Sequence, residues 1–429
     1  MQLFKRRQSS LGPNTATHVY QGGIPLHIVR GQGCHLYCSD GTEYLDCVNN
    51  VAHVGHCHPE VAQAVSQQLI TLNTNVRYLH SSVVDFAEAL VSTLPQQLQV
   101  CYYVNSGSEC NDLALRIARL ARPGATHVAV MAGAYHGHVS SLIDLSPFKF
   151  NGQGGGGQPA YVHVLPCPDT YRGLNLDGKA AARAAIEGAH AAGGKLCAFF
   201  CESILSCGGQ VVLPKGYLQD VYREMRAEGA LCVADEVQCG YGRAGSNFWV
   251  FETQDVAPDI LTTGKPIGNG FPMSVLVTSR ELAKSFSNGM EYFNTFGGCT
   301  AAGAAGLATF QVLRRERLQE NAAAVGAHLL HRLSMLQKEH ACLGDVRGMG
   351  LMQGIEIVTD PTSKRPDSKL AAELREQMAV RHHVLVAIEG PHNNIVKIKP
   401  PLCFSHKDAD RLVDALSDVL ASGKANGGC

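Results

Sequence analysis

The sequence has little that would point to a membrane or to nucleic acid. No apolar run approaches the roughly 20 residues that span a bilayer. Lys plus Arg number 36 against 37 Asp plus Glu, so the net charge is -1, whereas a surface for nucleic acid or anionic lipid needs an excess of positive charge. We therefore expect no nucleic-acid or membrane partner, and a small molecule as the ligand.

A disulfide framework is also missing from the sequence. The chain has 16 cysteines, but they are scattered through apolar segments, as Cys197, Cys201 and Cys232 are, rather than spaced as in small secreted domains. The basic cluster at residues 5–7 has no apolar run behind it that would make a signal peptide. We expect a cytoplasmic protein, with the mitochondrial matrix as the alternative.

Short apolar runs alternate with helical patterns through the middle of the chain. The runs are Val100–Val104, His127–Met131, Leu196–Phe200, Leu231–Ala234 and Ile260–Thr262, and helical spacing is clear over Asn111–Ala121 and Gly216–Ala227. Runs this short are typical of buried strands. The pattern predicts an α/β fold with a large, doubly wound, mostly parallel sheet.

The two ends of the chain have a different pattern and predict a smaller α+β domain. Gln21–Asp46 indicates short strands with a turn at Asp40-Gly41. The last third indicates a long alanine-rich helical region with a break at Arg314–Arg317, strands at Met352–Val358, Val384–Ile388 and IVKIKP, and a final helix over His406–Leu420. We expect residues 1–50 to form an arm that joins the small domain, 51–305 the large domain, and 306–429 the small domain.

Polar residues follow several of the predicted strands, at the edge of the sheet where open α/β folds bind ligands. In NSGSE, Asn105–Glu109, small residues open a helix and could bring backbone N–H groups to a phosphate; the same residues could simply form a capping turn. In AYHGH, Ala134–His138, the tyrosine could stack on a planar cofactor or pack in the core.

Three charged residues follow the next strands. Glu202 comes after LCAFFC, Asp235 ends ALCVAD, and Lys265 lies in TTGKPIGNGFP. A buried carboxylate needs a cation or donors, and burial lowers the pKa of a lysine and favours its nucleophilic form. A phosphate loop, an aromatic ring, a carboxylate and a lysine together are the parts that hold pyridoxal phosphate, so we expect that cofactor.

Histidines cluster twice, at His136 and His138 and at His53, His56 and His58. A zinc site needs three or four ligands with suitable spacing. Neither cluster has a suitably spaced ligand of another type. We expect no metal.

The blocks DEVQCGYGR and TTGKPIGNGFP, and nearly the whole chain from Pro25 to Leu420, resemble the class III, fold type I, pyridoxal-phosphate aminotransferases. The resemblance implies that Lys265 bonds the cofactor, that Asp235 pairs with its ring nitrogen, and that Gln238 approaches its ring hydroxyl. Gly107 and Ser108 would hold the phosphate and Tyr135 would stack on the ring, with His136 and Glu202 beside them. Thr295, in NTFGG, would reach the phosphate of a neighbouring subunit, which implies a homodimer or a tetramer.

Two blocks differ from the usual aminotransferase pattern. ESILSCGG has Cys207 where a second glutamate is common, and IVKIKPP offers Lys397 and Lys399 where an arginine usually holds the substrate carboxylate. With blocks such as NNVAHVGHCHP, LNTNVRYLH and PDTYRG, the chain is similar to the phospho-lyase branch of the family. The resemblance implies substrate contacts from Asn50, Arg77, Tyr78, His138 and Lys397.

That branch eliminates phosphate from a phosphorylated amine. We expect phosphoethanolamine to be converted to acetaldehyde, ammonia and phosphate. The alternatives are 5-phosphohydroxylysine as the substrate, an ω-aminotransferase reaction, and a non-catalytic protein with the same fold, which the presence of both Lys265 and Asp235 disfavours. Phe271 has no assigned role.

Overall fold

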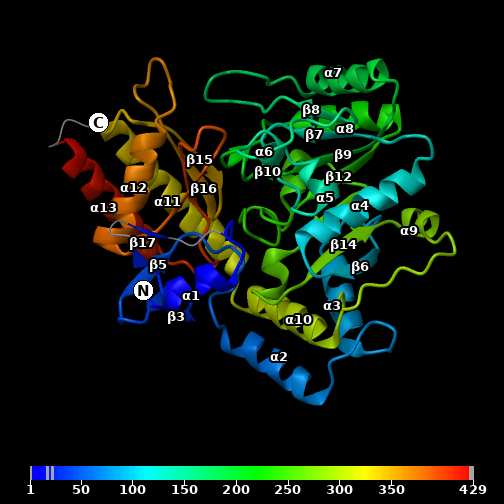
Figure 1. The fold of residues 1–429 in the computed structure, drawn as a ribbon, viewed down its shortest axis with the longest axis horizontal. Helices are drawn as coiled ribbons and strands as arrows, with labels where there is room; N and C mark the ends of the chain where they lie inside the picture. The colour runs from blue at the N-terminus through cyan, green and yellow to red at the C-terminus, as the bar shows by residue number, and fades with distance from the viewer. Residues whose placement is uncertain (1, 16–18, 21–23, 425–429) are drawn as a thin grey trace.

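The computed structural model describes residues 2–15, 19–20 and 24–424. It has two lobes, one built around a large sheet and one that contains both chain ends (Figure 1). The large sheet has seven strands in the order β6-β14-β13-β12-β9-β7-β8. Their bounds are Val100–Val104 for β6, His127–Met131 for β7, Val162–Leu165 for β8, Leu196–Glu202 for β9, Leu231–Asp235 for β12, Ile260–Thr263 for β13 and Ser274–Thr278 for β14.

The five strands predicted for this sheet are confirmed, and the sheet has two more, β8 and β14. Strands β8, β7, β9, β12 and β13 pair in parallel, whereas β14 is antiparallel to both β13 and β6. The chain reverses within residues 264–273, too short a link for a parallel crossover. The sheet is therefore mixed, and the segment containing Lys265 is a short loop between two adjacent strands.

Helices and short turns lie before, between and after these strands in the sequence, from Pro59 to Arg315. They are α2 (Pro59–Thr71), α3 (Ser81–Val91), α4 (Gly107–Ala121), α5 (Ser140–Ile143), α6 (Pro147–Phe150), α7 (Gly178–Ala191), α8 (Tyr217–Glu228), α9 (Arg280–Phe286) and α10 (Thr300–Arg315), with short 3₁₀ turns η1 (Val250–Gln254) and η2 (Lys265–Gly268). Helix α4 buries Leu113, Ile117 and neighbouring residues against Val130 and Phe200 of the sheet. This apolar contact fixes the start of α4 at the sheet edge.

The second lobe combines the two ends of the chain. One sheet has the order β17-β5-β4-β3 and another β15-β16-β19-β18. The strands are β3 (Ile28–Gln32), β4 (His35–Cys38), β5 (Glu43–Asp46), β15 (Leu343–Met349), β16 (Met352–Ile357), β17 (Val384–Leu385), β18 (Ala387–Glu389) and β19 (Ile395–Ile398), and the helices are α1 (Gln2–Ser10), α11 (Leu318–Glu339), α12 (Ser368–His382) and α13 (His406–Lys424). Strand β17 pairs with β5 in parallel, so the N-terminal arm and the last third share one sheet. The division at residues 51 and 306 stays a proposal.

Local expectations for the ends are largely confirmed. The helical region breaks between α10 and α11 at Arg317, which has φ of 53°, and the segment predicted as one strand over Val384–Ile388 is two strands, β17 and β18. Two-stranded pairs β1 (Val19–Tyr20) with β2 (Ile24–Pro25), and β10 (Ile204–Leu205) with β11 (Val211–Val212), complete the elements. The expected strand region from Gln21 begins outside the described residues. No helix in the described part of the chain is both long and apolar enough to cross a bilayer.

Candidate active site

A pocket of about 340 Å³ lies where several of the predicted strand ends meet. Its volume is in the range of small-molecule sites. It is lined by Val51, Asn105, Ser106, Gly107, Ser108, Asn111, Tyr135, His136, Gly137, Asp235, Val237, Gln238, Lys265, Gly270, Phe271, Pro272 and Met273. Segments separated by more than a hundred residues in the sequence therefore contribute to one cavity.

The N-terminus of α4 opens into this pocket. Ser106 caps the helix by accepting from the Glu109 N–H, and Glu109 accepts from the Ser106 N–H in return. The N–H groups of Gly107 and Ser108 find no acceptor among the described residues. A Cβ on Gly107 would lie 2.8 Å from Val237 Cγ1, so a side chain there would clash. Free N–H groups at the positive end of a helix suit a phosphate.

The carboxylate of Asp235 is held by three donors. Asn111 Nδ2 donates to its Oδ2 at 2.7 Å, His136 Nδ1 lies 2.8 Å from the same oxygen, and the Val237 N–H donates to Oδ1 at 3.1 Å. Thr262 Oγ1 donates to Asn111 Oδ1 at 2.7 Å, so the amide oxygen is occupied and the nitrogen must face Asp235. These donors fix the Asp235 carboxyl group in the lining of the pocket, where it can pair with a cationic group of a ligand.

Lys265 begins the turn η2 directly after β13 and lines the pocket. Its φ of 27° is an unusual backbone conformation for a residue with a side chain. Burial lowers the pKa of the Lys265 amine, and the nearby Asp235 acts in the opposite direction. A lowered pKa leaves more of the amine unprotonated at neutral pH, as nucleophilic attack on a carbonyl requires.

Glu202 lies behind the pocket and anchors two loops. Its Oε1 accepts from the Tyr135 N–H at 3.0 Å and its Oε2 from the Ser206 N–H at 3.1 Å. Burial, and then the charge of Asp235, raises the pKa of Glu202 to about 7. This carboxyl therefore fixes the backbone beside the half-buried Tyr135, whose ring lines the pocket.

Gln238 connects the pocket to the small lobe. Its Oε1 accepts from Lys399 Nζ at 2.5 Å, and its Nε2 lies 4.0 Å from Cys207 Sγ. Lys399 also donates to Ser206 Oγ at 3.0 Å. Burial raises the pKa of Cys207 to about 12, so its side chain is a neutral thiol at physiological pH.

These features can be tested against the cofactor that the sequence predicts. The imidazole Nε2 of His136 is buried without a hydrogen-bond partner in the described structure, and the helix N–H groups, the Asp235 carboxylate and the Lys265 amine line one cavity. These are an anion site, a partner for a ring nitrogen and a nucleophilic amine. The donor set fits pyridoxal phosphate.

Comparison with known proteins identifies the family. The family described as "Aminotransferase class-III" matches residues 17–420. The chain belongs to the class III aminotransferase family. Its fold is therefore that of the fold type I pyridoxal-phosphate enzymes, and its cofactor is pyridoxal 5'-phosphate.

Relatives of this class III chain carry names from two reaction types. A Drosophila melanogaster protein called "Alanine--glyoxylate aminotransferase 2-like" is 45% identical, with 98% of this chain and 87% of the relative covered. A Caenorhabditis elegans protein called "Ethanolamine-phosphate phospho-lyase homolog 1" is 40% identical, with coverage of 98% and 93%. A solved Arthrobacter phospholyase in complex with phosphoethanolamine has a TM-score of 0.92 and 39% identity, with coverage of 98% and 99%.

The class III chain does not bring all the predicted site residues into this pocket. Arg77 is paired with Glu291 at 3.0 Å and its side chain is half exposed; Tyr78 is also exposed. His138 and Thr295 have exposed side chains and do not line the cavity. The contribution of His138 is its backbone N–H, which donates to Ser108 Oγ at 3.0 Å.

Two other predicted substrate residues lie close to the pocket but outside its lining. Asn50 is buried next to Val51, and its Nδ2 has no hydrogen-bond partner in the described part of the chain. Lys397 is buried and bonded to Glu389. A phosphate would have to compete with Glu389 for the Lys397 ammonium group.

Several residues of the site were not predicted from the sequence. Asn111 and Thr262 orient the groups around Asp235, and Val237 lines the pocket beside Gly107. A polar residue on the apolar face of the α4 helix pattern was the available signal for Asn111. Phe271, left unassigned above, lines the pocket and packs against the large core.

The clustered histidines have separate partners. His53 Nε2 donates to the Tyr241 carbonyl at 2.6 Å, and His56 pairs with Asp46 at 2.6 Å. His58 lies 3.2 Å from Glu316. Among the described residues, no group of three or more His, Cys, Asp and Glu side chains is arranged to hold a metal ion.

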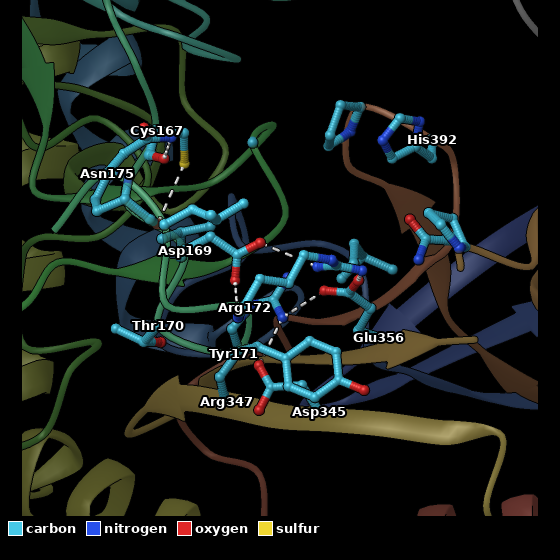
Figure 2. Close-up of a pocket in the computed structure, with 18 residues that line it drawn as sticks. Cys167, Asp169, Thr170, Tyr171, Arg172, Asn175, Asp345, Arg347, Glu356 and His392 are labelled. Atoms are coloured by element: carbon cyan, nitrogen blue, oxygen red, sulfur yellow. Dashed lines mark hydrogen bonds and ion pairs between the residues drawn. The ribbon is translucent and has the colours of Figure 1, made fainter. Parts of the chain in front are cut away.

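A second cavity, of about 330 Å³, lies between the PDTYRG segment and the small lobe (Figure 2). Arg172 pairs with Asp169 at 3.0 Å and with Glu356 at 2.6 Å, and Arg347 also pairs with Glu356, at 2.9 Å. The Nε of Arg347 donates to the Gly209 carbonyl at 2.9 Å. This ion cluster therefore ties the two lobes together and supports the loop that carries Ser206 and Cys207.

Proposed function

We propose that this chain is a pyridoxal-phosphate-dependent phospho-lyase that eliminates phosphate from a phosphorylated amino alcohol, with phosphoethanolamine as its substrate. The observation that carries the proposal is the neutral thiol of Cys207 beside Gln238 and a pair of buried lysines. Aminotransferases of the family commonly have a glutamate at this position. Replacing a carboxylate by a thiol removes a charge that would repel a phosphate dianion.

In the proposal, residues that line the pocket hold each part of the cofactor. Gly107 and Ser108 would bind its phosphate, Asp235 its ring nitrogen and Gln238 its ring oxygen, and Lys265 would bond its aldehyde carbon. Tyr135 would stack on the ring, with His136 and Glu202 holding Asp235 and the Tyr135 backbone in place. When bound, pyridoxal phosphate acts as an electron sink for the carbon that bears the substrate amine.

The residues of the chain account for the proposed elimination. With cofactor and substrate bound, Lys265 would take a proton from the carbon that bears the substrate amine, for which its lowered pKa suits it. The bond between the neighbouring carbon and the phosphate oxygen then breaks, and the electron pair leaves with the phosphate. Addition of one water gives acetaldehyde, ammonia and inorganic phosphate, so the atoms balance without a keto acid.

The leaving phosphate needs cationic donors, because charge-assisted hydrogen bonds to phosphate are the strong ones. Lys397 lies near enough for its charge to act on the Cys207 thiol, and the Nδ2 of Asn50 has no hydrogen-bond partner among the described residues. We propose that both contact the substrate, with Lys397 exchanging Glu389 for phosphate. Arg77, Tyr78 and His138 are exposed in the single chain, and we propose that they act across a subunit interface.

Exposed apolar side chains lie near Arg77 and Tyr78 in the sequence, and on the segment that Arg77 contacts through Glu291. Leu69, Ile70, Val76, Leu79, Met290 and Phe296 are all exposed, with Ile70 at 82% and Leu79 at 101%. A large exposed apolar patch marks a protein interface. We propose that a second copy of the chain covers it and brings its own Thr295 to the cofactor phosphate.

The dimer is tested by Leu79→Asp. A charge in a buried apolar interface is costly, so we expect the variant to have half the solution mass of wild type and to lose about 10-fold or more of its cofactor affinity. Sedimentation and cofactor titration measure the two effects. Val380→Asp, at an exposed position of α12, is the matched control. A Leu79→Asp protein that stays dimeric contradicts the proposed interface.

The proposed reaction is tested by adding phosphoethanolamine to the purified holoenzyme without any keto acid. We expect continuous release of phosphate and ammonia in equal amounts. Phosphate and ammonia assays measure both products, and 5-phosphohydroxylysine in a parallel reaction shows which tail the site accepts. If only 5-phosphohydroxylysine releases phosphate, the chain is still a phospho-lyase, but 5-phosphohydroxylysine and not phosphoethanolamine is its substrate.

An aminotransferase reaction is the second candidate, because the Drosophila relative at 45% identity carries an aminotransferase name. Transfer of the amino group to pyruvate or 2-oxoglutarate, with no phosphate released, would establish it and reject the lyase.

A cytoplasmic location, with the mitochondrial matrix as the alternative, is also part of the proposal.

A further inference from the structure

Lys399 is a buried lysine to which the proposed reaction assigns no contact with the substrate. Its side chain is 1% exposed, and it does not line the pocket. Burying an ammonium group costs free energy, and a well-packed apolar side chain of similar size is often as stable or more stable. Packing alone therefore does not explain a lysine at this position.

The backbone around Lys399 is held on both sides. The Lys399 N–H donates to the Cys47 carbonyl at 2.8 Å. Arg243 Nη1 donates to the carbonyl of the next residue, Pro400, at 2.8 Å. The ammonium group is therefore carried by fixed backbone at the end of β19, which limits where Nζ can lie.

From this fixed position Nζ contacts two neutral acceptors, Gln238 Oε1 at 2.5 Å and Ser206 Oγ at 3.0 Å. None of its hydrogen bonds goes to a carboxylate in the described part of the chain, and Glu389 is bonded to Lys397 instead. Gln238, unlike Lys399, lines the pocket. Lys399 thus reaches the pocket only through its neighbours.

Burial, and then the charge of Lys397, lowers the pKa of the Lys399 amine well below its usual value, but the amine has N–H donors in either protonation state and donates one of them to Gln238 Oε1. A glutamine amide has an oxygen end that accepts and a nitrogen end that donates, and the two ends can exchange by rotation. Bonding to Lys399 therefore selects the oxygen end of Gln238 for the buried side. The amide makes one other contact, from its Nε2 to Cys207 Sγ at 4.0 Å. Sulfur is a weak acceptor, so this contact does not fix the orientation of the Gln238 amide. The amide nitrogen is left as the end that can donate to a ligand in the pocket.

We propose that Lys399 is a positioning residue that orients the Gln238 amide, so that its nitrogen donates to the ring oxygen of the bound cofactor. A donor at this oxygen stabilises its anionic form. Such a donor would lower the pKa of the proton shared between the ring oxygen of the cofactor and the nitrogen of Lys265. This inference rests on the cofactor that the family uses and on the assignment of Gln238 to its ring oxygen, and not on the identity of the substrate.

The test is a pH titration of the visible absorption of the holoenzyme without substrate. Because no substrate is added, the result for Lys399 is independent of the phospho-lyase proposal, and either one can be rejected while the other stands. We expect the midpoint to rise by about one pH unit in Lys399→Met and in Gln238→Ala. Combining the two substitutions should raise it no further, because both remove the same hydrogen bond. Gln238→Glu keeps a partner for Lys399 but removes the donor, and should also raise the midpoint.

Ser206→Ala is the matched control, since it removes the other hydrogen bond of Lys399 and leaves Gln238 bonded; we expect the wild-type midpoint. An unchanged midpoint in Lys399→Met would overturn the proposal. So would shifts that add in the double variant, because they would show that the lysine charge acts through space. If Ser206→Ala raised the titration midpoint as much as Lys399→Met does, the change in midpoint would come from the loop that carries Ser206 and not from the orientation of Gln238.

Discussion

Replacing Lys265 by alanine should abolish the covalent attachment of the cofactor and lower kcat by about 10³-fold or more. In the proposed mechanism the variant removes both the amine that bonds the cofactor and the base that takes the substrate proton, and a positioned base alone contributes about 10²–10⁴-fold. Lys265 lines the pocket, and burial lowers its pKa. The visible absorption of purified protein, before and after borohydride reduction, measures attachment, and phosphate release measures kcat.

Lys284→Ala is the control for this experiment, because Lys284 is an exposed lysine of α9. It should retain wild-type absorption and turnover. A Lys265→Ala protein that still bonds the cofactor after reduction would mean that another lysine carries the site, and it would remove the basis of the proposed mechanism.

Asp235→Asn should lower kcat by about 10²–10³-fold while the cofactor remains bonded to Lys265. The loss is comparable to that from removing one preorganised electrostatic contact to developing charge. In the proposed site, the ring nitrogen would then have no anionic partner to keep it protonated. The new amide nitrogen would also face the donors of Asn111 and His136, and leaving buried donors unpaired costs about 1–3 kcal/mol.

The measurement is kcat for phosphate release together with the visible spectrum. Thr262→Val provides the comparison, since it removes only the bond that orients Asn111 and should lower kcat by about 10-fold at most. If Asp235→Asn turned over substrate at the wild-type rate, the carboxylate would have no part in the electron sink.

The sequence predicted much of the fold because strands and ligand contacts both leave local patterns. The apolar runs ending at Val104, Ala234 and Thr262 are all strand segments, and three of the motifs that follow them, NSGSE, DEVQCG and the Lys265 turn, meet in one pocket. The antiparallel strand β14 was missed. Its apolar run resembles the parallel strands around it, and only the pairing with β6 and β13 reveals its direction.

Contacts between distant segments left no such pattern. Asn111 belongs to the site because α4 packs on the sheet and brings it 2.7 Å from Asp235. Arg77 and Thr295 have suitable chemistry in the sequence, but the single chain leaves both on its surface.

The sequence by itself determined the alternation of strands and helices, the lysine and carboxylate at adjacent strand ends, and the family. These follow from short-range periodicity and from the rule that parallel strands end at one edge. Only the tertiary structure decided the orientation of the amides. Thr262 bonds the oxygen of Asn111 and Lys399 the oxygen of Gln238, and each donor comes from a segment more than 150 residues away. The direction in which a buried amide donates depends on the groups packed against it, and the fold alone brings those groups together.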